Sequence, residues 1–143
     1  MESARPFKLA LVPLLLVLAA CGGAMNIKDA PSACASNPNG HVEVYIPDAS
    51  VVRVLGERTG RSGVHEGFVI NACPRLTSCT REWTYLKVED NVAITGPIPL
   101  RRGDAVSLLG QLECDDNVIH WTHHDPRGRH QSGYIKVNGK LYE

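Results

Sequence analysis

The segment from His120 to His130 holds the residues with the clearest chemical potential in this sequence. Four of the chain's six histidines lie within it, together with Asp125, Arg127 and Arg129. Imidazole and carboxylate groups can bind a divalent metal ion, and guanidinium groups can bind an anion through paired hydrogen bonds. A histidine that a carboxylate orients can also act as a general base.

The spacing within this segment limits which side chains can meet. In an extended strand, His123 and Asp125 share one face about 7 Å apart, whereas His120 and His124 share the other face about 13 Å apart. The Asp-Pro-Arg-Gly sequence that begins at Asp125 has the composition of a turn, so later residues can fold back. We therefore expect His123, Asp125 and His130 to converge, with His120 or His124 contributing through the bend.

Three interpretations of this cluster stay open. The first is a structural network in which the histidines bond to carbonyls and carboxylates. The second is a binding site for a divalent metal or a small anion. The third is an enzyme in which His123 is the general base and Asp125 orients it. From elsewhere in the chain, His65 is the best further candidate, and it lies in the short stretch between Gly63 and Gly67. The candidate metal ligands are therefore His65, His120, His123, His124, Asp125 and His130. The candidate anion-binding residues are Arg127 and Arg129.

The elements that must position these residues are short β-strands. Apolar runs separated by turn residues, with little helical periodicity, predict an all-β barrel or sandwich. We expect Trp83 and Trp121 in its core. The runs are 41–46, 51–55, 68–70, 83–88, 92–94, 105–109, 118–122 and 134–137.

The N-terminus begins with a basic segment that is followed by a short apolar run. Arg5 and Lys8 precede an apolar run, residues 9–20, that is short for a permanent membrane span. The run ends in Leu-Ala-Ala-Cys, which resembles the motif cleaved by lipoprotein signal peptidase. We expect residues 1–20 to be removed and Cys21 to carry the lipid. Gly22, rather than Asp, follows the cysteine, which favours the outer membrane, facing the periplasm.

Composition bounds the remaining partners. Residues 21–40 are rich in Gly, Ala, Ser, Asn and Pro, which predicts a flexible tether. Fifteen Lys and Arg residues balance fifteen Asp and Glu residues, so the charge gives no strong signal for nucleic acid. The expected partners are the membrane, through the lipid, and a small ligand or metal ion.

Four cysteines remain once Cys21 is lipidated. An even number in an oxidising compartment predicts two disulfides, with three possible connectivities. We favour Cys73–Cys79, which would close a short loop, and Cys34–Cys114, which would join the N-terminal segment to the domain. The sequence contains no Cys-x-x-Cys pair, which is the spacing typical of a structural zinc site, so we favour disulfides over zinc.

A set of short motifs is spread over the chain from about Val51 to Tyr142. They are His65-Glu66-Gly67-Phe68, Asp90-Asn91-Val92, Ile98-Pro99-Leu100 with Gly103-Asp104, His120 to His130, and Gly133-Tyr134-Ile135 with Asn138-Gly139. Through these motifs the chain resembles a bacterial family of small secreted or lipid-anchored proteins catalogued as a domain of unknown function. The resemblance implies a small OB-type barrel but no activity.

Two positions depart from the pattern that this resemblance implies. The family is expected to have His-Gln at His65-Glu66 and His-Asn at Asp90-Asn91. If position 90 is a ligand position, a carboxylate preserves its chemistry, whereas a proton-transfer role is lost with the histidine.

We therefore predict an all-β, OB-like domain over residues 41–143 of an envelope lipoprotein, with a binding or structural role. Because OB-type barrels include a secreted nuclease, the alternative is a metal-dependent hydrolase, such as a phosphodiesterase, that uses the histidine cluster.

Overall fold

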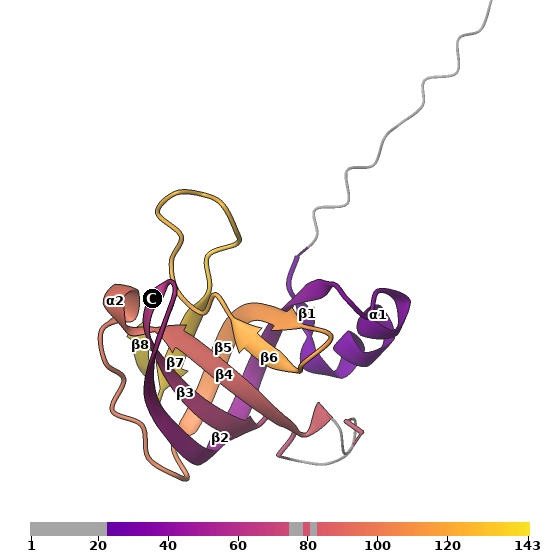
Figure 1. Ribbon diagram of the computed structural model, residues 1–143. Helices are drawn as coiled ribbons and strands as arrows, with labels where there is room; N and C mark the ends of the chain where they lie inside the picture. The colour runs from indigo at the N-terminus through magenta and orange to yellow at the C-terminus, as the bar shows by residue number, and fades with distance from the viewer. Residues whose placement is uncertain (1–22, 75–78, 81–82) are drawn as a thin grey trace, which may run out of the picture.

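The computed structural model describes residues 23–74, 79–80 and 83–143. Figure 1 shows the strands wrapped into a barrel, with helices α1 and α2 beside opposite ends. Within the described ranges, no helix is long and apolar enough to span a membrane. The predicted signal peptide and Cys21 lie outside these ranges.

In chain order the elements are β1 (Met25–Asn26), the 3-10 helix η1 (Ile27–Asp29), α1 (Ala30–Ser36), β2 (His41–Gly60), β3 (Gly63–Asn71), β4 (Tyr85–Asn91), α2 (Val92–Thr95), β5 (Ala105–Glu113), β6 (Val118–His120), β7 (Tyr134–Val137) and β8 (Lys140–Tyr142).

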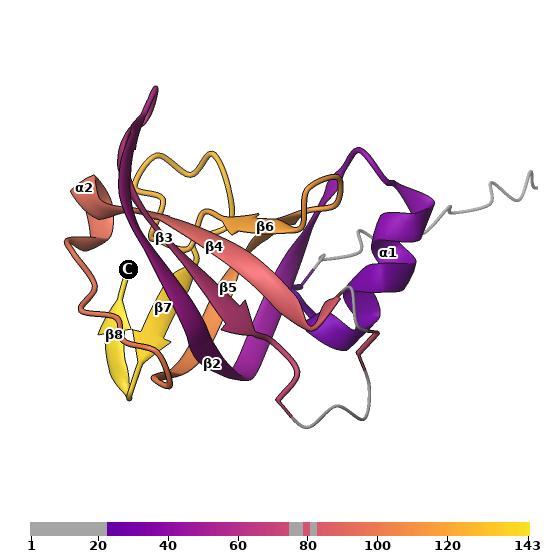
Figure 2. The same cartoon turned by 60° about the horizontal axis from the view of Figure 1, so that its bottom comes forward.

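Five strands form the barrel as a ring in the order β2–β3–β4–β6–β5, which closes where β5 pairs with β2 (Figure 2). All neighbours in the ring are antiparallel except β4 and β6, which run parallel. A five-stranded Greek-key barrel of this kind is an OB-type fold. The prediction of an all-β, OB-like barrel is confirmed.

Strand β2 is continuous through Pro47 and Asp48, where the sequence suggests a break between two strands. Its first half, from His41 to Ser50, pairs with β5, and the rest pairs with β3. The register shifts between Ile46 and Ala49. A bulge tolerates proline because it interrupts the ladder of hydrogen bonds, and it also bends the strand. One long bent strand can therefore take part in both sides of the ring.

The prediction of a flexible tether over residues 21–40 is wrong for the part that the structure describes. β1 pairs in parallel with β2, and α1 follows it. Ile27, Ala30 and Cys34 are buried in the barrel's core cluster. Small residues let the short helix lie close to the barrel, and the local sequence pattern does not predict this packing.

Residues 92–94, expected as a strand, instead form the single helical turn of α2. The side chain of Asn91 accepts a hydrogen bond from the amide of Ala93 at 3.1 Å, which caps the turn. Gly96 ends it with a φ of 73°. The cap and the glycine outweigh the β propensity of the apolar residues between them.

The core is built from side chains that alternate along the strands, and every strand of the ring contributes. Trp83 is buried as expected, whereas Trp121 is 41% exposed, contrary to expectation. Fully buried residues of the ring are Val44, Ile46, Val51, Phe68, Ile70, Leu86, Val88, Leu108, Leu112 and Ile119.

Both favoured disulfides are formed in the structure. Cys34 of α1 is joined to Cys114, just after β5, with a Cα–Cα distance of 5.3 Å. Cys73 is joined to Cys79 with a Cα–Cα distance of 6.2 Å. The first bond fastens the N-terminal helix to the barrel, and the second closes a local loop.

Removing the long-range disulfide should destabilise the protein more than removing the short one. The bonds span sequence separations of 80 and 6 residues. The chain-entropy model gives losses of about 4.5 and about 2.3 kcal/mol, respectively. Urea unfolding followed by circular dichroism should compare Cys34→Ser/Cys114→Ser with Cys73→Ser/Cys79→Ser. Equal losses would contradict the dependence of the stabilisation on the length of the closed loop.

Candidate functional site

The register of three strands places polar side chains in a row on the outside of the barrel. Arg58 of β2 pairs with His65 of β3, and His65 pairs with Asn91 of β4. Side chains alternate between the two faces of a strand, and the neighbours of His65 that point inward, such as Phe68, are buried. The row lies near the tip of the β2–β3 hairpin, which projects beyond the rest of the barrel in Figure 2.

His120, at the end of β6, lies beside Glu89 of β4. The parallel pairing of these strands aligns Val88 with Ile119, so the next residue of each strand occupies the same level. The Nδ1 atom of His120 is 3.8 Å from a carboxylate oxygen of Glu89. The β4–β6 pairing thus brings the first histidine of the cluster to the row formed by β2, β3 and β4.

Glu89 is a buried carboxylate with cationic neighbours. Arg58 donates to it at 2.7 Å, and Lys87 also donates to it. Burial alone would raise the pKa of Glu89, but the hydrogen bonds from Lys87 and Arg58 outweigh burial and lower this pKa below its ordinary value. Glu89 therefore stays ionised at neutral pH and holds the guanidinium of Arg58 at the barrel wall.

Trp121 reverses the alternation of side chains where the chain leaves β6. Its φ is 51°, in the left-handed region that residues other than glycine rarely adopt. Thr122 is consequently fully buried, and its hydroxyl donates to Asp90 at 2.8 Å. The left-handed residue is the reason that Trp121 lies outside the core.

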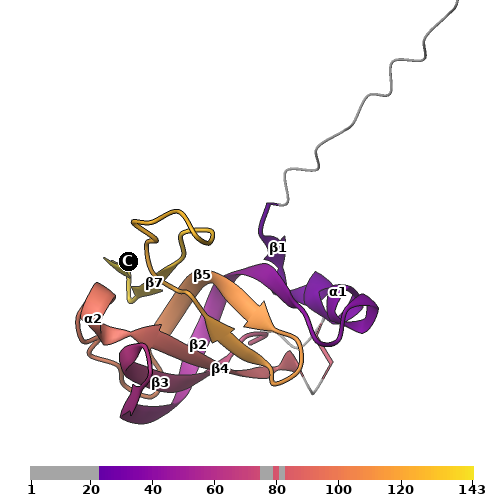
Figure 3. The same cartoon turned by 45° about the horizontal axis from the view of Figure 1, so that its top comes forward.

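Asp125 organises the loop that follows, residues 121–133, which projects between β6 and β7 (Figures 1 and 3). Its carboxylate accepts hydrogen bonds from the main-chain amides of Arg127, Arg129 and His130. Burial opposes ionisation, but these amides lower the pKa of Asp125 from 3.8 to about 2. The carboxylate also lies 3.7 Å from Nε2 of His130.

Three aromatic rings meet on this loop. The indole of Trp121 stacks on His130, with 4.3 Å between ring centroids and an angle of 25°. His123 meets His130 edge to face at 5.3 Å. The Nδ1 atoms of His123 and His130 lie 2.9 and 2.8 Å from the carbonyls of His124 and Gln131. A carbonyl accepts only from a protonated nitrogen, so each Nδ1 is the donor, and Nε2 of His130 faces Asp125.

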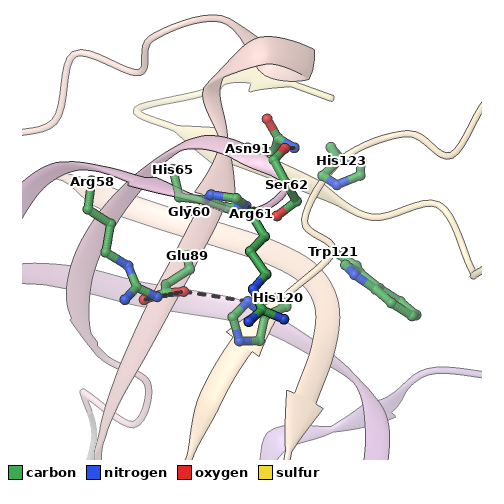
Figure 4. Close-up of a pocket in the computed structure, with 10 residues that line it drawn as sticks. All are labelled: Arg58, Gly60, Arg61, Ser62, His65, Glu89, Asn91, His120, Trp121 and His123. Atoms are coloured by element: carbon green, nitrogen blue, oxygen red, sulfur yellow. Dashed lines mark hydrogen bonds and ion pairs between the residues drawn. The ribbon is translucent and has the colours of Figure 1, made fainter.

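These side chains line two adjoining hollows of about 270 and about 370 Å³, which together we call the histidine groove. Figure 4 shows Arg58 and Glu89 at one side and Trp121 at the other. Both hollows are lined by Ser62, His65, Asn91, Trp121 and His123. The first is also lined by Arg58, Gly60, Arg61, Glu89 and His120. The second is also lined by Ile94, Arg129 and His130.

The structure brings together most, but not all, of the candidate residues. Those that line the groove are His65, His120, His123, His130 and Arg129. Asp125 is buried within its own loop and does not line the groove. His124 and Arg127 are exposed, and the Nδ1 atom of His124 lies 3.1 Å from the hydroxyl of Ser132. The expected convergence of His123, Asp125 and His130 exists, but the imidazole beside the carboxylate is that of His130.

Sequence reasoning missed the groove residues contributed by β2, β4 and the hairpin. Arg58 and Arg61 belong to a charged stretch that reads as an ordinary surface loop, and Glu89 reads as one acidic residue within a strand. A usable signal was the short sequence distance from Arg58 and Arg61 to His65, because a hairpin turn between them brings such residues together. Ser62 carried no signal of its own, and Asn91 appeared only within one motif of the family resemblance.

Asp90 belongs to the interior of the barrel end. It is fully buried and accepts hydrogen bonds from the hydroxyls of Thr95 and Thr122. Burial raises the pKa of Asp90 above its ordinary value, against the effect of both hydroxyls. The neighbouring Glu66 is also buried, and it accepts from the amide of Ile98 at 2.9 Å. Position 90 therefore links α2, β4 and the start of the loop, and the adjacent Asn91 faces the groove.

The candidate metal ligands are not gathered into a coordination group. Across the ranges that the structure describes, no set of three or more His, Cys, Asp or Glu residues is placed to hold a metal ion. The imidazoles instead lie beside main-chain carbonyls, two hydroxyls, two carboxylates and each other. His65, for example, lies 3.2 Å from both the carbonyl of Gly63 and the hydroxyl of Ser62.

Fold and site together define a small OB-type barrel with a polar groove beside its hairpin and the loop after β6. The chain belongs to the family described as protein of unknown function (DUF3465), whose sequence model matches residues 39–143. No curated protein and no solved structure matches the chain.

Asp125→Asn should destabilise the protein at neutral pH, because an amide cannot accept three main-chain hydrogen bonds as well as a carboxylate. Since the pKa of Asp125 is lowered to about 2, its contribution is complete above about pH 4 and is lost as the pH falls toward 2. Urea unfolding at several pH values should therefore show wild type and variant converging in acid. Asp115→Asn, at an exposed turn, is the control. A constant difference across this range would contradict the role of the carboxylate.

Proposed function

We propose that this protein is a lipid-anchored binding module of the bacterial envelope, and that its histidine groove binds a small anionic ligand. The observation that carries the proposal is the gathering of cationic and imidazole side chains on one groove. Arg58, Arg61 and His65 come from the β2–β3 hairpin, whereas His120 and His123 come from β6 and its loop. Guanidinium and imidazole groups are the usual donors to phosphate and carboxylate oxygens.

The charge balance supports an anion over a cation. The groove contains one acidic side chain, Glu89, and this carboxylate is already paired with Arg58 and Lys87. Arg61, in the turn after β2, has no hydrogen bond or ion pair with any described side chain, and it lines the same hollow. An incoming anion would therefore meet an available forked donor without first having to displace a carboxylate.

The proposed cellular location rests on the N-terminal sequence. Cys21 directly follows the apolar run and is the acceptor for a diacylglycerol anchor. The four other cysteines pair with each other within the barrel, so Cys21 is left for lipid. Lipid on Cys21 would place the groove at the periplasmic face of the outer membrane.

The full-length protein in detergent should bind inorganic pyrophosphate, and Arg61→Ala should weaken the binding at least tenfold. A charge-assisted hydrogen bond typically contributes about 1.5–3 kcal/mol, and about 1.4 kcal/mol corresponds to a tenfold change. Isothermal titration calorimetry would measure both affinities. Arg102→Ala, at an exposed turn outside the groove, is the matched control and should bind as the parent does. Absence of binding by the parent, or equal weakening by both variants, would contradict an anion site in the groove.

Cys21→Ser should abolish acylation and release the protein from the membrane fraction, since serine cannot form the thioether to diacylglycerol. Metabolic labelling with a palmitate analogue, followed by membrane fractionation, measures both effects. Cys34→Ser should retain the label, because this cysteine forms a disulfide. A Cys21→Ser protein that keeps both the label and its membrane association would show that the lipid is elsewhere.

A further inference from the structure

We propose that the stacked pair Trp121–His130 is a platform for the aromatic base of a nucleotide, whose phosphate is held by Arg61. This inference rests on the anion site proposed above and names its ligand as a nucleoside monophosphate unit. The unit has a planar ring and a phosphate at opposite ends, which matches the arrangement of aromatic and cationic side chains along the histidine groove.

The first observation is the conformation and exposure of Trp121. A large aromatic residue is held at a φ of 51° with 41% of its surface exposed. Both features are unfavourable for the isolated protein, because left-handed backbone is strained in residues other than glycine and exposed indole loses hydrophobic stabilisation. Strain of this kind clusters at ligand sites, where it directs a side chain outward to a partner.

The second observation is that the platform is rigid. His130 is held from one side by its Nδ1 contact with the carbonyl of Gln131 and from another by Asp125. It stacks on Trp121 at 4.3 Å. Gly133 closes the loop tightly, because an added Cβ would lie 2.2 Å from the carbonyl oxygen of Trp121. A rigid ring loses little conformational freedom when a base stacks on it.

The third observation is the layout of the groove. Trp121 lines both hollows, and in Figure 4 its indole lies on the opposite side from Arg58 and Glu89, with Arg61 and His65 between. The hollows of about 270 and about 370 Å³ adjoin, which gives room for one nucleotide. A base stacked at the Trp121 end would therefore leave its phosphate toward Arg61.

The near-neutral charge of the chain favours one nucleotide over a long strand. Fifteen Lys and Arg residues balance fifteen Asp and Glu residues, whereas affinity for long nucleic acids depends on many phosphate contacts. The recognised unit is thus a single base with its phosphate, present either as a free nucleotide or within a short single strand. The OB-type barrel is compatible with both sources.

Calorimetry on the full-length protein in detergent tests this proposal with AMP, ribose 5-phosphate and pyrophosphate. AMP should bind about tenfold or more tightly than ribose 5-phosphate, the gain typical of a base stacked on an aromatic ring. Trp121→Ala should abolish this preference, so that AMP and ribose 5-phosphate bind with equal affinity. Trp121→Phe should retain part of it, because phenylalanine also stacks. Trp83 is buried, so a change in tryptophan fluorescence on binding would come from Trp121.

The controls separate the two proposals. Equal affinity of the parent for AMP and ribose 5-phosphate, with pyrophosphate still bound, overturns the platform alone. No binding of pyrophosphate by the parent overturns the anion site. Trp121→Gly relieves the left-handed strain, so loss of the base preference in a variant that keeps the parent's circular dichroism spectrum reflects the missing ring. A single-stranded tetranucleotide bound more than tenfold more tightly than AMP identifies the source as a strand, and equal affinities identify a free nucleotide.

Discussion

The parallel pairing of β4 with β6 is the constraint on which the arrangement of the groove depends. Parallel strands end at the same edge of a sheet, so Asn91 and His120 emerge close together. Because β3 is antiparallel to β4, the tip of the β2–β3 hairpin lies at this edge too. If β6 were antiparallel to β4, it would end near Tyr85. His120 and the loop with the remaining histidines would then lie at the opposite edge of the sheet.

A second constraint follows where β6 ends. The inward turn of Thr122 requires left-handed backbone at Trp121, and such strain persists only where the surrounding contacts compensate for it. The hydroxyl of Thr122 bonds to buried Asp90, and the carboxylate of Asp125 gathers three amides of the loop. The backbone that carries the exposed indole is therefore fixed on one side by the Thr122–Asp90 hydrogen bond to the barrel and on the other by the loop that Asp125 organises.

Sequence patterns could predict the barrel because side-chain alternation is a local property of each strand. The density of histidines likewise indicated the loop after β6. The approach of Arg58 to Glu89 could not be predicted, since the register of β2 against β3 includes two irregularities. The exposure of Trp121 also had no signal, because a two-residue period places it inside. The packing of Ile27 depends on contacts with distant strands, so the composition alone suggested a tether.

Glu89 determines where in the groove an anion can lie. Its ionised carboxylate would repel a phosphate placed between Arg58 and Lys87, so those cations serve mainly to neutralise Glu89. Arg61 remains outside this network, on the hairpin and beside His65 in the same hollow. The favourable position for negative charge is thus shifted from the barrel wall toward the hairpin tip. In the proposed complex, such a polarised groove would orient an elongated ligand with its charged end at Arg61 and its other end toward Trp121.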